Sequence, residues 1–403
     1  MPDHFAPAGQ LAGGSSTAAR RRALQAVFCF VGISLASWVT RTPAIRESLH
    51  ASTAQMGLVL FGLSAGSMTG ILSAGALVRR FGTKAVITGG AALVVTGLAA
   101  LGGSTALQLP SGAFGGLLLF GLGMGSFEIA TNIEGAEIER IAGRPLMPQL
   151  HGTFSAGTVA GSVLGLVFTR AGVDVLWHLL AAAVVGAGIV AVSAPSIPAG
   201  FAVSRRPVEH GGGSAVRDQL RLWKQRRMAL LGCVVLGMAL AEGAANDWLP
   251  LLMVDTHGFD PAGGSLLFAA FAAAMTAGRF AGGRLLRRFS RAVVVRSSAV
   301  CAGTGLAVVI GTPFPSLAVV GVVFWGLGTS LGFPLALSAA GDGDGDTTAR
   351  VGAVATAGYL AFLVGPPLLG LLGDHFGLRY AMLVVLALIG CAAATAAAVR
   401  PER

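Results

Sequence analysis

The stretch GALVRRF at residues 75–81 returns as GRLLRRF at residues 283–289. Each copy closes a long apolar run with a pair of arginines and a phenylalanine. The two runs share further residues in the same order, since the LF pair at 60–61 recurs at 267–268. Self-similarity of this kind indicates a duplicated architecture. We therefore expect two copies of one structural unit.

The composition places most of this chain in a lipid bilayer. Of its 403 residues, 54% are hydrophobic and only 11% are charged, against about 25% charged residues in a typical soluble domain. Crossing a hydrocarbon core of about 30 Å takes roughly 20 helical residues, and such apolar segments recur along the chain. The sequence predicts an all-α integral membrane protein with twelve transmembrane helices. The predicted spans are 23–40, 53–78, 85–103, 111–132, 150–170, 176–195, 228–251, 263–286, 293–311, 316–340, 351–373 and 378–399.

These spans divide into two pseudo-symmetric six-helix bundles. FGLG at 120–123 in the fourth span matches WGLG at 325–328 in the tenth, so the repeat runs through both halves. The connections are too short to hold a globular catalytic domain, and we do not expect an enzyme. The predicted division is a cytoplasmic tail at 1–22, an N-terminal bundle at 23–198, a basic linker at 199–227, a C-terminal bundle at 228–399 and a tail at 400–403.

The orientation follows from the basic residues, because cytoplasmic loops retain Lys and Arg. With the N-terminus inside, the outer loops hold only Arg41, Arg46, Arg170 and Arg379. Both termini are therefore predicted to be cytoplasmic, in a multi-pass protein of the inner or plasma membrane. The net charge of +10 is spread over these loops, which favours anionic lipid headgroups over nucleic acid as the partner.

A G-x-L-x-x-R-x-G-x-K element separates the second and third spans. Its members are Gly75, Leu77, Arg80, Gly82 and Lys84. Two six-span halves joined by a basic loop, with this element, resemble the major facilitator superfamily. The resemblance implies a gating loop at Gly75, Arg80, Gly82 and Lys84. Arg79 stands where the superfamily usually has an acid, which puts the charge relay of that loop in question here.

Three stretches resemble one branch of the superfamily, which includes fucose permease and uncharacterised sugar-permease-like proteins. They are ASWVTRTPAIRESL, EIATNIEGAEIERIAGRPLMPQLHGTFSAG and AEGAANDWLPLLM. That branch tends to carry an acid on its fourth helix, where this sequence has Glu128. The resemblance implies a secondary active transporter that alternates access around a midplane site.

Polar residues inside two spans are the candidate site. Glu128 and Asn132 lie four residues apart in the fourth span, so a helix presents them on one face. The seventh span repeats this spacing with Glu242 and Asn246, and Asp247 follows directly. An ionisable group in a bilayer costs on the order of 2.5 to 3.5 kcal/mol and normally faces a water-filled cavity or a partner. We predict that these residues bind the solute or the coupling proton.

Other candidates have two explanations each. Trp38 and Arg41, at the end of the first span, suit stacking on a sugar and pairing with an acid, or form an interfacial aromatic with a flanking arginine. Asp247 is a ligand, or a solvated or capping residue. His151 is a secondary candidate for coupling, and Arg279 either extends toward the cytoplasm or pairs with an acid.

The sequence thus predicts proton-coupled transport of a small, sugar-like solute, with Glu128 as the proton-carrying or substrate-binding acid. Proton-driven efflux of amphipathic or cationic compounds would use the same acids. A non-transporting membrane sensor of the same fold is a third alternative. The expected partners are a solute, protons and anionic headgroups. We expect a monomer with no cofactor and no metal site.

Overall fold

The computed structural model describes residues 17–142, 146–198, 221–342 and 347–400. Within these residues, eleven helices are long and apolar enough to cross a membrane. The predicted N-terminal tail and linker lie mainly outside the described residues. The first helix begins at Thr17 and runs through the arginines at 20–22, because arginine is a good helix former.

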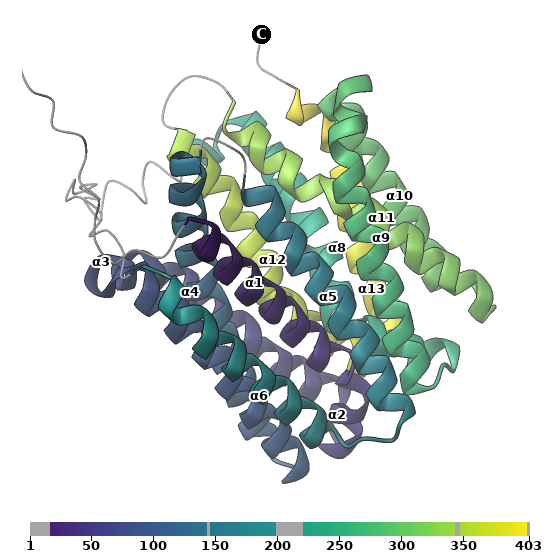
Figure 1. Ribbon diagram of the computed structural model, residues 1–403. Helices are drawn as coiled ribbons and strands as arrows, with labels where there is room; N and C mark the ends of the chain where they lie inside the picture. The colour runs from purple at the N-terminus through teal and green to yellow at the C-terminus, as the bar shows by residue number, and fades with distance from the viewer. Residues whose placement is uncertain (1–16, 143–145, 199–220, 343–346, 401–403) are drawn as a thin grey trace, which may run out of the picture.

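The helices follow one another with short connections. The long ones are α1 (Thr17–Val39), α3 (Thr53–Ala106), α4 (Pro110–Ala142), α5 (Met147–Arg170), α6 (Val175–Ser193), α8 (Arg226–His257), α9 (Pro261–Arg288), α10 (Arg291–Gly311), α11 (Pro315–Ala340), α12 (Thr347–Phe376) and α13 (Leu378–Thr395). Three short ones are α2 (Thr42–Ser48), η1 (Ala194–Ser196) and η2 (Ala396–Val399). Figure 1 shows the long helices packed side by side, with α2 far from the C-terminus.

The range α3 contains the second and third predicted spans as two helical segments that meet at a kink. Its 54 residues contain one non-helical residue, Gly82, at φ 82° and ψ 164°. A straight helix of this length would extend about 81 Å, far more than the bilayer core of about 30 Å. The break at Gly82 divides α3 into two segments, and glycine adopts this backbone conformation without a side-chain clash.

The same close helix contact appears in both halves. A Cβ on Gly97 of α3 would lie 2.7 Å from the carbonyl oxygen of Gly116 on α4. In the second half, a Cβ on Gly321 of α11 would lie 2.7 Å from the carbonyl oxygen of Gly305 on α10. Small residues let membrane helices approach to backbone contact. The repeat in the sequence is therefore also a repeat in packing.

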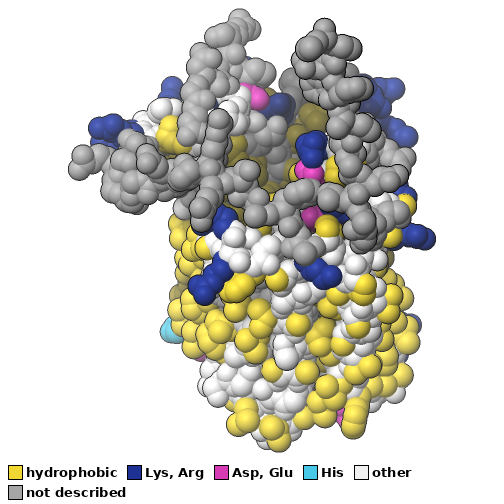
Figure 2. All heavy atoms as spheres, turned by 60° about the vertical axis from the view of Figure 1, so that its left-hand side comes forward, with side chains coloured by type: hydrophobic (Ala, Val, Ile, Leu, Met, Phe, Trp, Pro, Cys, Tyr) yellow, Lys and Arg dark blue, Asp and Glu magenta, His cyan; other side chains and the backbone are white. Residues whose placement is uncertain are grey.

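The two ends of the bundle differ in charge. We call one end the basic end; among the described residues it carries Arg20, Arg80, Arg140, Arg227 and Arg288. We call the other the α2 end, because α2 lies there. Figure 2 shows Lys and Arg side chains gathered toward one end, with hydrophobic side chains over the rest of that face.

Candidate solute site between the two halves

Glu128 lies on an exposed part of the α4 surface, between the flanks that pack on α1 and α3. On one flank, Phe120 and Phe127 meet Trp38 and Phe28 of α1. On the other flank, Gly121 packs tightly on the backbone of α3. Between these flanks the Glu128 side chain is exposed.

The charge of Glu128 also acts on a side chain of the other half. Glu128 is within electrostatic range of Tyr359 on α12, and Tyr359 is itself half-buried. No described residue forms an ion pair with Glu128. One turn along α4, the Asn132 Oδ1 atom is buried and accepts no hydrogen bond from the described residues. The face therefore offers an unpaired acid and an unused amide oxygen.

The second predicted acid is not free. Glu242 on α8 forms an ion pair with Arg279 on α9, with 2.9 Å between Oε1 and Nη2. Arg279 is also within electrostatic range of His151 on α5, which places all three near the contact between the halves. Of the two alternatives for Arg279, the structure has the pairing with an acid.

Asn246 and Asp247 follow Glu242 on α8. Asn246 is half-buried, whereas Asp247 is only 6% exposed. The described residues form no hydrogen bond or ion pair with the Asp247 carboxylate. Asp247 thus lies largely inside the bundle, where a charge is costly without a partner.

Trp38 is fully enclosed, at 0% exposure. Its ring meets Phe120 edge to face, at 6.4 Å between centroids and 76° between planes. Its Nε1 atom is buried and donates to no described residue. In this conformation Trp38 belongs to the α1–α4 packing, and its face is not open to a solute.

Arg41 is also enclosed, at 5% exposure, in the turn between α1 and α2. Its Nη1 atom donates to Thr169 Oγ1 at 3.1 Å and its Nη2 atom to the Val173 carbonyl at 2.5 Å. Burial lowers the pKa of Arg41, and the charge of Asp174 partly opposes that shift. Arg41 thus holds the α1–α2 turn to the α5–α6 connection, at a distance from the open face of α4.

The gating-loop residues surround the break in α3. Arg80 lies over the Phe81 ring, with its guanidinium carbon 5.2 Å from the centroid. Gly82 forms the break itself, and Lys84 is half-buried in the following turn. A Cβ on Gly75 would approach only Arg79 Nη1, at 3.5 Å. The backbone conformation of this loop therefore favours glycine at position 82, whereas position 75 has room for a small side chain.

Sequence reasoning missed two residues. Tyr359 is one of only two tyrosines, and a lone polar aromatic in an apolar span was the available signal. Glu134 lies beyond the predicted end of the fourth span, yet its carboxylate is 4% exposed and pairs with Arg20 at 2.5 Å. Thr83 donates to the same carboxylate at 3.3 Å. Glu134 therefore ties α1 to the turn after Gly82.

The α2 end is closed by bonds between the halves. Arg46 of α2 contacts both carboxylate oxygens of Asp255 on α8, at 2.5 and 2.7 Å. The Ser265 hydroxyl of α9 donates to the Thr40 carbonyl at 2.9 Å. Bidentate pairs of arginine and carboxylate add geometric specificity as well as energy.

A second set of contacts closes the same end between α3 and α12. The Ala54 amide donates to Asp374 Oδ1 at 3.3 Å. A Cβ on Gly57 would lie 2.9 Å from the Gly370 Cα atom. The α2 end is therefore sealed on two sides of the interface.

A duplicated bundle of membrane-length helices, with polar residues between its halves, defines a multi-pass membrane transporter. Residues 23–351 match the family model of the Major Facilitator Superfamily, and the chain belongs to that superfamily. This confirms the resemblance drawn from the repeat and the loop element. Proteins of this superfamily are transporters and not enzymes.

Two relatives in sequence are transporters described as uncharacterised. The chain is 31% identical to the uncharacterized transporter y4wD of Sinorhizobium fredii, over 90% of this chain and 94% of that protein. It is 28% identical to an uncharacterized MFS-type transporter of Yersinia pestis, over 92% of this chain and 94% of that protein.

Solved structures share the fold at low identity. The nucleoside transporter NupG superposes with a TM-score of 0.72 at 17% identity, covering 95% of this chain and 100% of that one. FucP in its outward conformation gives a TM-score of 0.66 at 16% identity, covering 95% and 99%. At these identities the likeness establishes the fold alone.

Proposed function

We propose that this protein moves a small polar solute across the cytoplasmic membrane by alternating access, coupled to protons through Glu128. The observation that carries this proposal is the open face of α4. There an unpaired acid lies one turn from an unused amide oxygen and within electrostatic range of Tyr359 in the other half. A site at the interface of two repeats is where such transporters bind their solute and coupling ion.

The proposed topology has twelve crossings, because each segment of α3 on either side of Gly82 crosses once. The basic end lies in the cytoplasm, in keeping with the retention of Lys and Arg on that side. Both termini then lie in the cytoplasm. The closure of the α2 end by the Arg46–Asp255 pair makes this conformation the one that is sealed toward the outside.

The favoured solute is neutral and rich in hydroxyl groups, such as a sugar. An amide oxygen, a carboxylate and a phenol suit hydroxyl donors and acceptors. NupG is a nucleoside transporter and FucP is a fucose:proton symporter, and both carry their solutes on this fold. Export of amphipathic cations is the second candidate, because Glu128 has no positive partner among the described residues and attracts a cation.

The test uses proteoliposomes that contain a pH dye. Pools of sugars, nucleosides and cationic compounds are added in turn to the wild type, Glu128→Gln and Glu137→Gln. Glu137 is the matched control, because it lies on the same helix but pairs with Arg140 on the surface. We expect one pool to drive a proton flux that Glu128→Gln abolishes and Glu137→Gln retains.

Other outcomes separate the alternatives. Solute flux that survives Glu128→Gln with its proton coupling intact would remove Glu128 from the mechanism. Saturable binding without flux in any pool would support a sensor. A response to cations alone would replace uptake of a neutral solute with efflux.

A further inference from the structure

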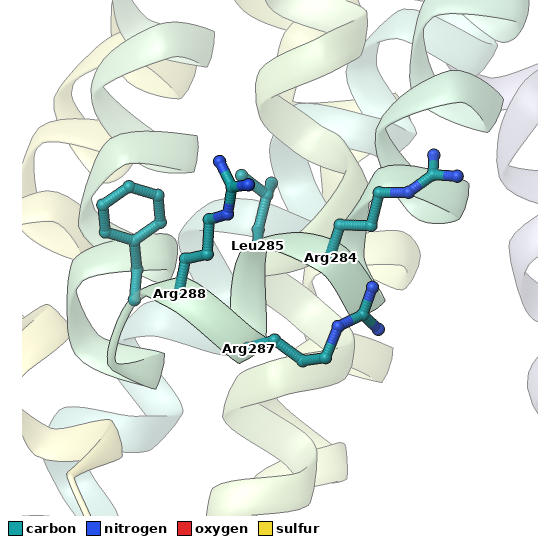
Figure 3. A pocket seen from close by; sticks show the side chains of 5 residues that line it. Arg284, Leu285, Arg287 and Arg288 are labelled. Carbon is teal, nitrogen blue, oxygen red and sulfur yellow. The ribbon is translucent and has the colours of Figure 1, made fainter.

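The last two turns of α9 form a pocket at the basic end. Arg284, Leu285, Arg287, Arg288 and Phe289 line a cavity of about 420 Å³. All five residues are exposed. Figure 3 shows the Arg284 and Arg288 side chains rising on the same side of the helix as Leu285, and Arg287 extending away from them. The pocket therefore combines guanidinium groups with an apolar wall.

These arginines have no counter-charge within their part of the chain. No Asp or Glu occurs between Asp260 and Asp342. Asp342 is already engaged by Arg291, at 2.5 Å. The three pocket arginines form no ion pair with any described residue. Three like charges within two helical turns repel one another, so an external anion would stabilise them.

The surroundings indicate what kind of anion. Phe280 is 70% exposed, Leu286 40% and Phe289 51%. In a membrane protein, exposed apolar side chains of this kind contact hydrocarbon, and arginines at the helix end reach the headgroup level. A dissolved anion needs no apolar wall, whereas a phospholipid offers a phosphate and acyl chains together.

The repeat shows that the first of the three arginines belongs to the second copy alone. In the aligned copies, GALVRRF against GRLLRRF, Arg284 replaces Ala76. In the first copy Arg80 lies over the ring of Phe81, whereas in the second copy Arg288 and Phe289 both line the cavity. The extra arginine is therefore an addition to the shared hairpin.

We propose that the basic end of α9 binds the headgroup of an anionic phospholipid, with the phosphate beside Arg284 and Arg288 and the charge of Arg287 adding to the positive potential of the pocket. The acyl chains then lie along Phe280 and Phe289. Basic pockets on the cytoplasmic side of helix bundles bind anionic lipid headgroups. This site depends on membrane insertion only, and it stands whether or not Glu128 couples transport to protons.

The test measures binding of phosphatidylglycerol to the purified full chain by native mass spectrometry. The variant is Arg284→Gln/Arg287→Gln/Arg288→Gln. The matched control is Arg79→Gln/Arg80→Gln/Lys84→Gln, which removes three charges from the equivalent hairpin. Each arginine near an anionic surface contributes about fivefold in affinity. We expect a loss of at least about tenfold in the pocket variant and less than about threefold in the control.

Three results would overturn the proposal. Equal losses in both variants would mean that total charge, and not the pocket, determines binding. If phosphatidylethanolamine bound as tightly as phosphatidylglycerol, the site would not distinguish a neutral headgroup from an anionic one. Competition by soluble glycerol phosphate as strong as by the lipid would make this an anion site without a lipid. If the glutamine variant misfolds, Arg284→Lys/Arg287→Lys/Arg288→Lys tests the same point, since it is expected to fold and to retain most binding.

Discussion

The two halves repeat the same helices but differ in how they treat their membrane acids. In the N-terminal half, Glu128 is exposed and unpaired among the described residues. In the C-terminal half, Glu242 is paired with Arg279 at 2.9 Å, and Phe333 occupies the position that repeats Glu128. An unpaired acid can exchange a proton or hold a ligand, whereas a paired acid fixes the packing of two helices. Duplication thus supplied a common scaffold, and only one half retained a free acid on its fourth helix.

The hairpins at the basic end differ in the same way. Gly82 separates the two helical segments of α3 at a positive φ. Its counterpart Ser290 adopts an extended conformation, at φ −66° and ψ 150°, and separates α9 from α10. The backbone conformation at Gly82 favours glycine, whereas the conformation at Ser290 is one that other residues also adopt.

The largest expected effect is on the free acid. Glu128→Gln should reduce proton-driven solute accumulation to the level of empty liposomes, because glutamine cannot release a proton. Counterflow exchange of labelled solute needs no net proton movement and should persist. Loss of both activities would indicate that Glu128 binds the solute itself, and retention of accumulation would contradict its coupling role.

The next effect tests the two hairpins against each other. Gly82→Ala should destabilise the protein by about 1 to 3 kcal/mol, because a side chain is strained at this backbone conformation. Ser290→Ala, at the equivalent position, should change stability little, since the Ser290 side chain caps no helix. Thermal unfolding in detergent measures both. Equal melting temperatures for the two variants would show that the break in α3 does not need glycine.

A smaller loss of stability is expected from breaking the ion pair between Glu242 and Arg279. Glu242→Gln leaves the Arg279 charge unpaired between two helices. The partners are 17% and 37% exposed, so we expect a cost of about 1 to 2 kcal/mol, less than the 3 to 5 kcal/mol for a fully buried pair. The double variant Glu242→Gln/Arg279→Gln should recover part of this loss in a double-mutant cycle. If the stability changes of the two single variants add up to that of the double variant, the two side chains do not stabilise each other.

The smallest effect concerns the closure of the α2 end. Arg46→Gln removes a partly exposed pair worth about 0.2 to 1 kcal/mol, and it should shift the population toward opening at that end. Distances between spin labels on α2 and α8 would measure the shift. In the wild type, high salt should act in the same direction, because it screens exposed charges. A distance distribution unchanged by both would mean that the α3–α12 contacts alone keep this end closed.

Much of the fold could be predicted from local patterns. Long apolar runs, the repeated GALVRRF and GRLLRRF stretches and the uneven spread of arginines indicated a duplicated helical membrane protein. The apolar helices and the family match confirm a helical membrane protein of that superfamily. The boundary between the second and third spans could be predicted only roughly, since the structure narrows it to a kink at the single residue Gly82.

The candidate site was only partly predictable. Glu128, Asn132 and Glu242 were found because polar residues in an apolar span stand out. Tyr359 was missed because nothing near it in the sequence connects it to Glu128. Trp38 was a candidate for stacking on a solute, and only its contact with Phe120 shows that the ring is enclosed.

The sequence by itself indicated which segments lie in the bilayer and which lie in water. It also indicated the repeat and the presence of acids within membrane helices. These properties depend on residue type and spacing along one helix, where hydropathy and charge act locally. The tertiary structure decided which acid is free, which is paired and which end is closed. Those outcomes depend on contacts such as Glu242 with Arg279 and Arg46 with Asp255, which form only when distant helices pack against one another.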